Sequence, residues 1–106
     1  ELTVKGIFEG IPDAFQADKA VGVEVVFQFD ISGGEAGSWY VTVKDGICEV
    51  AEGTHTGATT TIKMADKDFV MLIKGELNAM KAFTSGKLRI EGDLMKSQLI
   101  EKLFKF

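Results

Sequence analysis

The Asp45-Gly46 dipeptide lies directly between two β-rich runs, residues 39–44 and residues 47–51. Asp-Gly is favoured where both central residues of a tight turn need a positive φ, as in a type I′ hairpin. The two runs are therefore expected to pair as antiparallel strands. A chain that contains this hairpin has to build the rest of its core against a sheet.

Three further segments have strand patterns. Residues 23–31 alternate with a period of two, so that apolar side chains point to one face and mostly polar ones to the other. The threonine-rich segment 58–64 is favoured as a strand by β-branching. Together with the hairpin these segments predict a four-stranded meander. Leu88 and Ile90 alternate with charged residues, which predicts a short fifth strand.

The first segment of the chain has the spacing of a helix instead. Apolar residues recur from Val4 to Phe15 as in an amphipathic helix, and Thr3 is suited to cap its N-terminus. Pro12 removes a backbone N–H, so we expect a kink or a restart there, followed by a loop over residues 16–20.

Further helices are expected in the second half of the chain. Asp66 can cap a helix that ends before Gly75, because glycine suits the position after a helix. A second helix is predicted from about residue 77 to 84, and Gly92-Asp93 opens a last helix that continues to the end of the chain. The pattern as a whole predicts an α+β protein in which residues 1–106 form a single domain.

Two of these helices carry more apolar surface than contact with one sheet face explains. Five consecutive apolar residues at 69–73 wrap most of the way round a short helix. On the last helix the apolar side chains span an arc of about 180°. These surfaces pack on each other, line a cavity or meet another subunit. All four methionines lie in this half of the chain. They either fill the core in the ordinary way or form a site that adapts to varied apolar partners.

No group of residues has the pattern of an active site. Cys48 is the only cysteine, which excludes an internal disulfide and a thiolate metal site, and we expect a half-buried structural thiol. His55, the only histidine, stands in a Thr/Gly turn and is expected at the surface. Helix capping explains Asp66 and Asp68. We therefore expect a binding protein and not an enzyme, with no catalytic residue, no metal and no cofactor.

The charge of the chain disfavours nucleic acid as a partner. The net charge is −4, whereas a nucleic-acid binder normally has a basic surface. Residues 81–106 are mildly basic. This charge indicates either a solvated helix face or a region that attracts an acidic surface or an anionic ligand. No apolar run approaches the roughly 20 residues of a membrane span, and the N-terminus lacks the layout of a signal peptide. Glu1 at the start leaves open both a trimmed chain and a piece of a longer protein.

Several short segments, in their order along the chain, resemble one known family. They are Val26–Asp30, Trp39–Gly46, Thr61–Phe69, Gly75, Asn78, Ala82-Phe83, Gly86–Leu88 and Ile90–Asp93. Each segment is weak alone, but their order and spacing from about Val4 to Leu103 are specific. On these residues the chain resembles the sterol-carrier-protein type 2 domain.

The resemblance implies a five-stranded, mostly antiparallel sheet covered on one face by helices, with an apolar tunnel between the layers. Such a tunnel takes up fatty acids, fatty acyl-CoA, phospholipid or sterol, and the excess apolar surface would face it. The lipid-binding residues expected from face and family together are Phe27, Phe29, Met64, Phe69, Leu72, Ile73, Met80, Phe83, Met95, Leu99 and Leu103. The lipid head group is expected near Lys87, Arg89, Lys96 and Lys102.

The expected function is non-catalytic lipid binding, with lipid transfer as its extension. The alternative is a structural or dimerisation module, including an accessory domain of a larger lipid-metabolising enzyme. A homodimer and transient contact with a membrane surface stay open as further interactions. Residues 103–106 do not match the Ser-Lys-Leu-type address of peroxisomal members, so a cytoplasmic location is expected.

Overall fold

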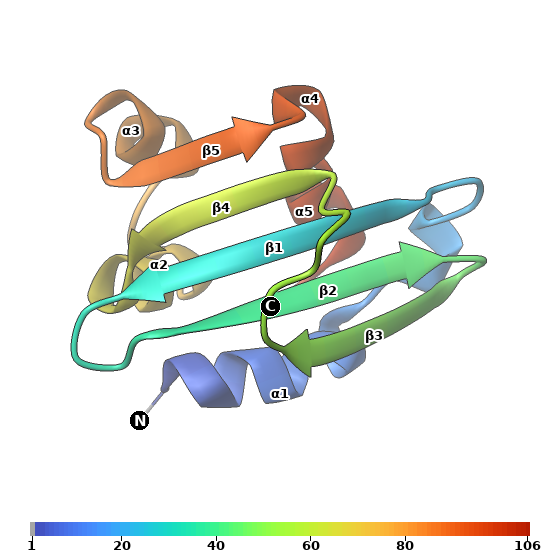
Figure 1. The fold of residues 1–106 in the computed structure, drawn as a ribbon, viewed down its shortest axis with the longest axis horizontal. Helices are drawn as coiled ribbons and strands as arrows, with labels where there is room; N and C mark the ends of the chain where they lie inside the picture. The colour runs from blue at the N-terminus through green and yellow to red at the C-terminus, as the bar shows by residue number, and fades with distance from the viewer. Residues whose placement is uncertain (1) are drawn as a thin grey trace.

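The computed structural model describes residues 2–106, which form one sheet with the helices behind it in the view of Figure 1. The strands are β1 (Val25–Ser32), β2 (Gly37–Lys44), β3 (Ile47–Glu52), β4 (Thr60–Ala65) and β5 (Leu88–Gly92). The helices are α1 (Val4–Ala14), the 3-10 turn η1 (Ala17–Lys19), α2 (Asp66–Ile73), α3 (Ala79–Thr84), α4 (Leu94–Ser97) and α5 (Leu99–Leu103). None of these helices is long and apolar enough to cross a membrane.

The five strands have the order β3-β2-β1-β4-β5. The central pair, β1 and β4, runs parallel, and the other three neighbouring pairs run antiparallel. The predicted hairpin is confirmed, because β2 and β3 pair across the turn in which both Asp45 and Gly46 have positive φ. The predicted fold, a mostly antiparallel five-stranded sheet with helices on one face, is confirmed as well.

The path from β3 to β4 shows that the predicted four-stranded meander is wrong. Residues 53–59 cross in front of β2 and β1 in Figure 1, and β4 pairs with β1 instead of β3. The buried amide of Gln28 holds the crossing segment: it donates to the Gly53 carbonyl (3.0 Å) and accepts from the backbone N–H of His55 (2.8 Å). A buried amide needs such partners, and strand periodicity does not reveal which segment supplies them.

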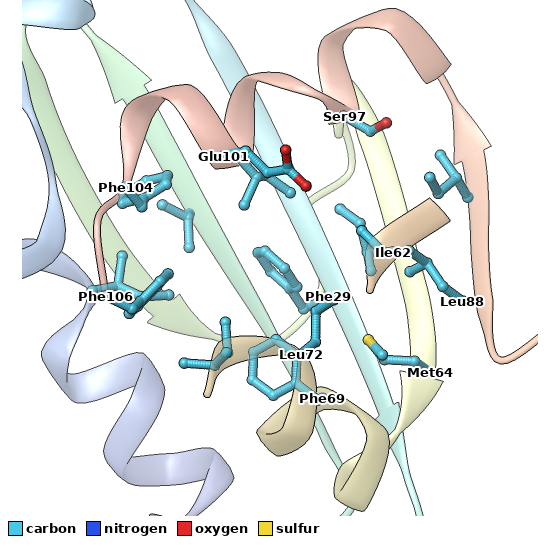
Figure 2. Close-up of a pocket in the computed structure, with 16 residues that line it drawn as sticks. Phe29, Ile62, Met64, Phe69, Leu72, Leu88, Ser97, Glu101, Phe104 and Phe106 are labelled. Atoms are coloured by element: carbon cyan, nitrogen blue, oxygen red, sulfur yellow. The ribbon is translucent and has the colours of Figure 1, made fainter. Parts of the chain in front are cut away.

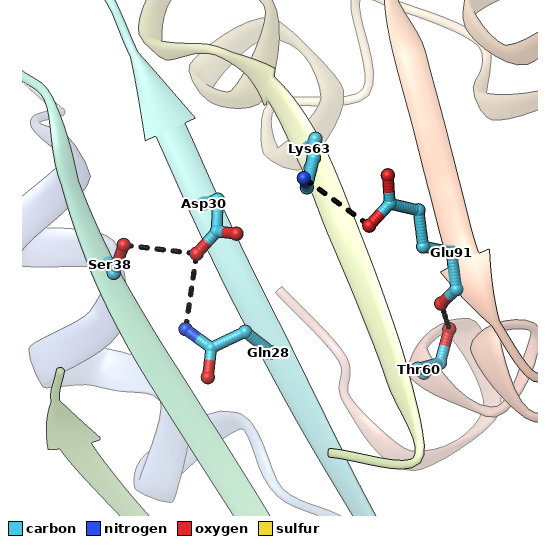
Figure 3. Close-up of polar contacts among 6 residues, drawn as sticks. All are labelled: Gln28, Asp30, Ser38, Thr60, Lys63 and Glu91. Carbon is cyan, nitrogen blue, oxygen red and sulfur yellow. Dashed lines mark hydrogen bonds and ion pairs between the residues drawn. The ribbon is translucent and has the colours of Figure 1, made fainter. Parts of the chain in front are cut away.

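The two faces of the sheet differ as the alternation on β1 predicts. The side chains turned toward the helices are buried, and they are Val25, Phe27, Phe29 and Ile31. The opposite face is polar. Figure 3 shows Asp30 accepting hydrogen bonds from Gln28 and Ser38, while Lys63 on β4 pairs with Glu91 on β5 at 3.3 Å. The apolar core therefore lies between the sheet and the helices.

Helix α1 begins as predicted but does not restart at Pro12. The Oγ1 of Thr3 accepts the N–H of Gly6 at 3.0 Å, which confirms the N-cap. Of the predicted kink or restart, the restart is wrong, because the helix continues through Pro12 to Ala14. Pro12 lies in the last turn, so the missing N–H removes a hydrogen bond only near the end of the helix.

Asp66 connects two segments instead of only capping α2. The N-cap residue is Ala65, and the Asp66 carboxylate accepts the N–H of Lys67 and the N–H of Glu35, both at 2.9 Å. Gly33 in the β1–β2 loop has a φ of +112°, and a Cβ there would collide with this carboxylate. The loop and the start of α2 therefore fit together with glycine at this position.

The end of the chain corrects the predicted last helix. Two short helices, α4 and α5, take its place, and the backbone becomes extended at Phe104, which forms a β-bridge with Phe15. The N–H of Gln16 donates to the Leu103 carbonyl at 2.7 Å, and the N–H of Lys105 donates to the Ala14 carbonyl at 2.9 Å. These bonds to the end of α1 take the place of helical ones.

Candidate functional site

The layer between sheet and helices is filled by aromatic rings at the end where α1 lies. Phe8 of α1 stacks on Trp39 of β2 with ring centroids 4.6 Å apart. It also stacks on Phe69 of α2 at 5.2 Å and meets Phe29 of β1 edge-on at 5.2 Å. Rings at these separations interlock and leave little free space. This end of the layer is a packed core.

The same layer contains a cavity of about 310 Å³ further along the sheet, between the strands and helices α2, α3, α4 and α5. Figure 2 looks into it from the helical side. Its lining residues are Ile11, Phe29, Val41, Ile62, Met64, Phe69, Leu72, Ile73, Ala79, Leu88, Ile90, Ser97, Ile100, Glu101, Phe104 and Phe106. The volume falls at the lower end of the ~300–1,000 Å³ typical of small-molecule pockets.

The burial of the lining residues shows which side of the cavity is open. Phe29 and Ile62 on the strands are buried, at 6% and 4% exposure. Leu72 on α2 and Ile100 on α5 are half-buried, and Phe106 is 56% exposed. The cavity therefore has its floor on the sheet and its mouth between the helices.

All lining residues are apolar except two, Ser97 and Glu101. Ser97 lies at the end of α4, is buried and donates its hydroxyl hydrogen to the Leu94 carbonyl at 2.6 Å. Glu101 is exposed on α5, and its carboxylate projects toward the middle of the labelled side chains in Figure 2. An apolar wall with a few placed polar groups is the usual character of a small-molecule site.

Five of the eleven residues predicted from the sequence lie together in the wall of this cavity. They are Phe29, Met64, Phe69, Leu72 and Ile73. Phe27 and Leu103 are fully buried in the adjoining core, and Leu99 is half-buried against it. These three side chains pack beside the cavity without lining it.

The other three predicted residues lie at the surface. Met80 and Phe83 on α3 are 67% and 41% exposed, and Met95 on α4 is 76% exposed. Helix α3 buries Ala82 against the core instead, so the larger side chains around it turn outward. Their contact with a lipid stays a prediction.

Sequence reasoning missed several wall residues. Val41, Ile62, Leu88 and Ile90 belong to the inward-facing positions of β2, β4 and β5, and strand alternation carries the signal that finds them. Phe104 and Phe106 carried no strand alternation, but the helical wheel placed them on the apolar face of the expected last helix. Their position depends on the chain leaving the helical path after Leu103.

The basic residues predicted near the head group do not line the cavity. Lys87 and Arg89 lie with Lys63 in a separate groove of about 440 Å³, which Asp30 and Asp68 also line. Arg89 stands on β5 between Leu88 and Ile90, which line the cavity, so alternation turns it to the opposite face of the sheet. Arg89 therefore points away from the cavity, while Met64 lines both the groove and the cavity.

The groups considered for chemistry lie outside the cavity. Burial and the neighbouring Glu49 carboxylate raise the pKa of the Cys48 thiol to about 11, so this half-buried side chain stays protonated at neutral pH. His55 is partly exposed in its turn, where it packs edge-on against Tyr40 at 5.1 Å and accepts the Gly57 N–H at 2.9 Å. Residues 2–106 contain no cluster of three His, Cys, Asp or Glu side chains that could hold a metal ion.

Comparison with known proteins gives one family and several relatives. The model described as the SCP-2 sterol transfer family matches residues 5–105. Hydroxysteroid dehydrogenase-like protein 2 of Rattus norvegicus is 32% identical over 101 residues, which are 94% of this chain and 19% of that protein. The chain thus spans about a fifth of the length of that curated relative. The oleate-induced peroxisomal protein POX18 of Candida maltosa is 31% identical over 105 residues, which are 95% of this chain and 83% of that protein.

Solved structures share the fold. Sterol carrier protein 2 from Yarrowia lipolytica, in its apo form, superposes with a TM-score of 0.76 at 26% identity, over 92% of this chain and 85% of that one. Palmitated SCP2L2 from Aedes aegypti also gives a TM-score of 0.76, at 24% identity, over 95% of this chain and 94% of that one. The arrangement of strands and helices in this chain is thus one that these structures also have.

Proposed function

The chain belongs to the SCP-2 sterol transfer family, and we propose that it binds one lipid with the apolar part in the cavity between the sheet and helices α2 to α5. The observation that carries the proposal is the apolar wall, which only Ser97 and Glu101 interrupt. Burial of a hydrocarbon chain against such a wall contributes about 0.8 kcal/mol per CH₂ group. The Aedes aegypti neighbour with the same fold is a palmitated protein, which supports a lipid as the ligand class.

The proposal assigns binding and no chemical step to this domain. Ser97, the one hydroxyl in the wall, donates its hydrogen to the Leu94 carbonyl, and within residues 2–106 no hydrogen bond joins it to a histidine or to Glu101. A serine nucleophile needs a base within hydrogen-bond reach. The polar groups of the wall therefore suit recognition of a head group.

The matching domain makes up most of one relative and a small part of another. POX18 is covered for 83% of its length, whereas the rat hydroxysteroid dehydrogenase-like protein is covered for 19%. The second value supports the alternative that this unit is an accessory domain of a larger lipid-metabolising enzyme. Lipid transfer, a homodimer, contact with a membrane surface and a cytoplasmic location stay predictions.

Native mass spectrometry of protein purified without detergent, followed by extraction of the bound lipid, tests the proposal. We expect a complex of one lipid with one chain. Leu72→Trp places a larger side chain at the half-buried mouth of the cavity and is expected to abolish uptake of a fluorescent acyl-chain probe with a neutral head group. Met71→Trp is the matched control, because Met71 is the preceding residue of α2, is 39% exposed and does not line the cavity.

Urea unfolding of both variants is measured first, and loss of uptake counts as evidence only for a variant that is folded. Equal uptake by wild type and folded Leu72→Trp would show that the ligand lies elsewhere. A wild-type protein that carries no lipid and takes up no probe would overturn the proposal.

A further inference from the structure

The two polar residues in the cavity wall, Ser97 and Glu101, each carry a hydrogen-bond acceptor. A serine hydroxyl has one hydrogen to donate, and that of Ser97 is used on the Leu94 carbonyl at 2.6 Å. Its oxygen keeps lone pairs with which it can accept a hydrogen bond. Ser97 is 7% exposed, so its surroundings provide little water to satisfy those lone pairs.

Glu101 adds a charged acceptor at the mouth. Ser97 ends α4 and Glu101 lies on α5, and both residues line the cavity. Within residues 2–106 the Glu101 carboxylate forms no ion pair and no hydrogen bond. Lys102 and Lys105, its basic neighbours along the chain, are both exposed. The negative charge at the mouth is thus not neutralised by a direct contact.

From these two residues we infer that the cavity selects lipids whose head group donates hydrogen bonds, an alcohol or an amine, over lipids with a carboxylate, and so differs from the palmitated Aedes aegypti neighbour. The inference rests on the proposed function, because it concerns the head group of the same bound lipid. A hydroxyl or ammonium head can donate to the Glu101 carboxylate or to Ser97 Oγ. An ionised fatty acid has no hydrogen to donate and brings a second negative charge to the same mouth.

Three ligands with the same hydrocarbon chain isolate the head group: lauryl alcohol, laurylamine and laurate. Their affinities for the wild-type protein are measured at neutral pH by displacement of a neutral fluorescent acyl probe. We expect the alcohol and the amine to bind more tightly than laurate. In Glu101→Gln the gap between alcohol and laurate is expected to narrow by about fivefold, the effect of removing one unit charge about 4 Å from another in a water-like medium.

Glu76→Gln is the matched control. Glu76 is also exposed, pairs with Lys74 at 3.5 Å and does not line the cavity, so this variant makes the same change in net charge at a distance. It is expected to keep the wild-type gap. A narrowed gap in Glu101→Gln alone supports the inference.

Two outcomes would overturn the inference and are distinguishable from each other. Binding of all three ligands with the same relative affinities in wild type and Glu101→Gln would remove the role of Glu101 and leave lipid binding intact. Failure of all three ligands and of the neutral probe to bind wild-type protein would remove the proposed function together with the inference.

Discussion

The two ends of the layer between the sheet and the helices lie on the same inner face of the sheet, but one end is tightly packed and the other contains a cavity. Phe29 and Phe69 belong to both ends, because they pack against Phe8 on one side and line the cavity on the other. Toward α1 the neighbouring positions carry aromatic rings that stack at about 5 Å. Toward α4 and α5 the wall is formed mainly by aliphatic side chains and encloses about 310 Å³.

The lengths of the covering helices explain much of this difference. Helix α1 has 11 residues and buries Val4, Ile7, Phe8 and Ile11 in one continuous stripe. Helices α4 and α5 have 4 and 5 residues and turn only Ser97 and Leu103 fully inward. A long amphipathic helix can seal a sheet face, whereas short segments with polar residues between them leave part of it uncovered. The cavity lies where these short helices cover the sheet, and Ile11 of α1 lines its edge.

The largest expected effect comes from opening the packed end. Phe8→Ala removes a ring that is 2% exposed and touches three other aromatic rings, so we expect a loss of about 3–5 kcal/mol in the free energy of unfolding. Leu72→Ala at the cavity removes atoms that already border empty space and is expected to cost about 1 kcal/mol. Urea unfolding followed by circular dichroism measures both.

The ratio between these two losses tests the comparison. If Phe8→Ala is too unstable to purify, Phe8→Leu takes its place and is still expected to cost more than Leu72→Ala. Equal losses at the two positions would mean that the cavity end is packed as tightly as the aromatic end.

A smaller effect is expected from the contact that fixes α1 over the packed end. The Glu35 carboxylate accepts the N–H of Val4 at 2.9 Å and that of Lys5 at 3.2 Å, and so satisfies two donors of the first helical turn. Glu35→Ala is expected to cost about 1–2 kcal/mol and to speed hydrogen exchange in α1, without changing exchange at the wall of the cavity.

The control for this change is Glu76→Ala, which removes an exposed partner of Lys74 and is expected to cost no more than about 0.5 kcal/mol. Exchange that speeds equally in α1 and α5 of Glu35→Ala would show that the two ends are stabilised together.

Strand patterns made most of the sheet predictable, and with it the floor of the cavity. Alternation placed Phe29 and Met64 inward, and the same rule reaches Ile62, Leu88 and Ile90. The order of the strands was not predictable in this way. It depends on Gln28, whose buried amide holds the segment that crosses from β3 to β4, and a single buried glutamine has no periodic signal.

The helical wall was harder to predict, for a different physical reason. A helical wheel assumes one continuous helix, and it grouped Met95 with the other apolar residues of this segment, Leu99, Ile100, Leu103, Phe104 and Phe106. The chain leaves the helical path after Leu103 to pair with the end of α1, a contact between residues about 90 positions apart that no local pattern contains. Met95 is exposed on α4, which ends before α5 begins, whereas Phe106 is part of the cavity wall.

The smallest expected effect is a pH dependence of stability at Asp66, which joins the β1–β2 loop to the start of α2. The pKa of the Asp66 carboxyl lies below its ordinary value of 3.8, mainly because it accepts a hydrogen bond from the N–H of Glu35. Partial loss of solvation opposes this shift, whereas the backbone N–H and the charge of Lys67 lower the pKa further. Because the folded state has the lower pKa, Asp66 contributes stability above 3.8 and loses it as the pH falls through the lowered value. The stability difference between wild type and Asp66→Asn is therefore expected to shrink on acidification.

Asp68→Asn serves as the control, since it removes the same charge from the same turn of α2 without removing a hydrogen bond to the β1–β2 loop. Urea unfolding at neutral pH and at about pH 3 measures the difference, which is expected to stay small because the Asp66 carboxylate is partly solvated. A difference that does not change with pH would mean that the amide of asparagine replaces the carboxylate in holding Glu35. In that case the shape of the β1–β2 loop would position α2 beside the cavity, and the charge of Asp66 would not.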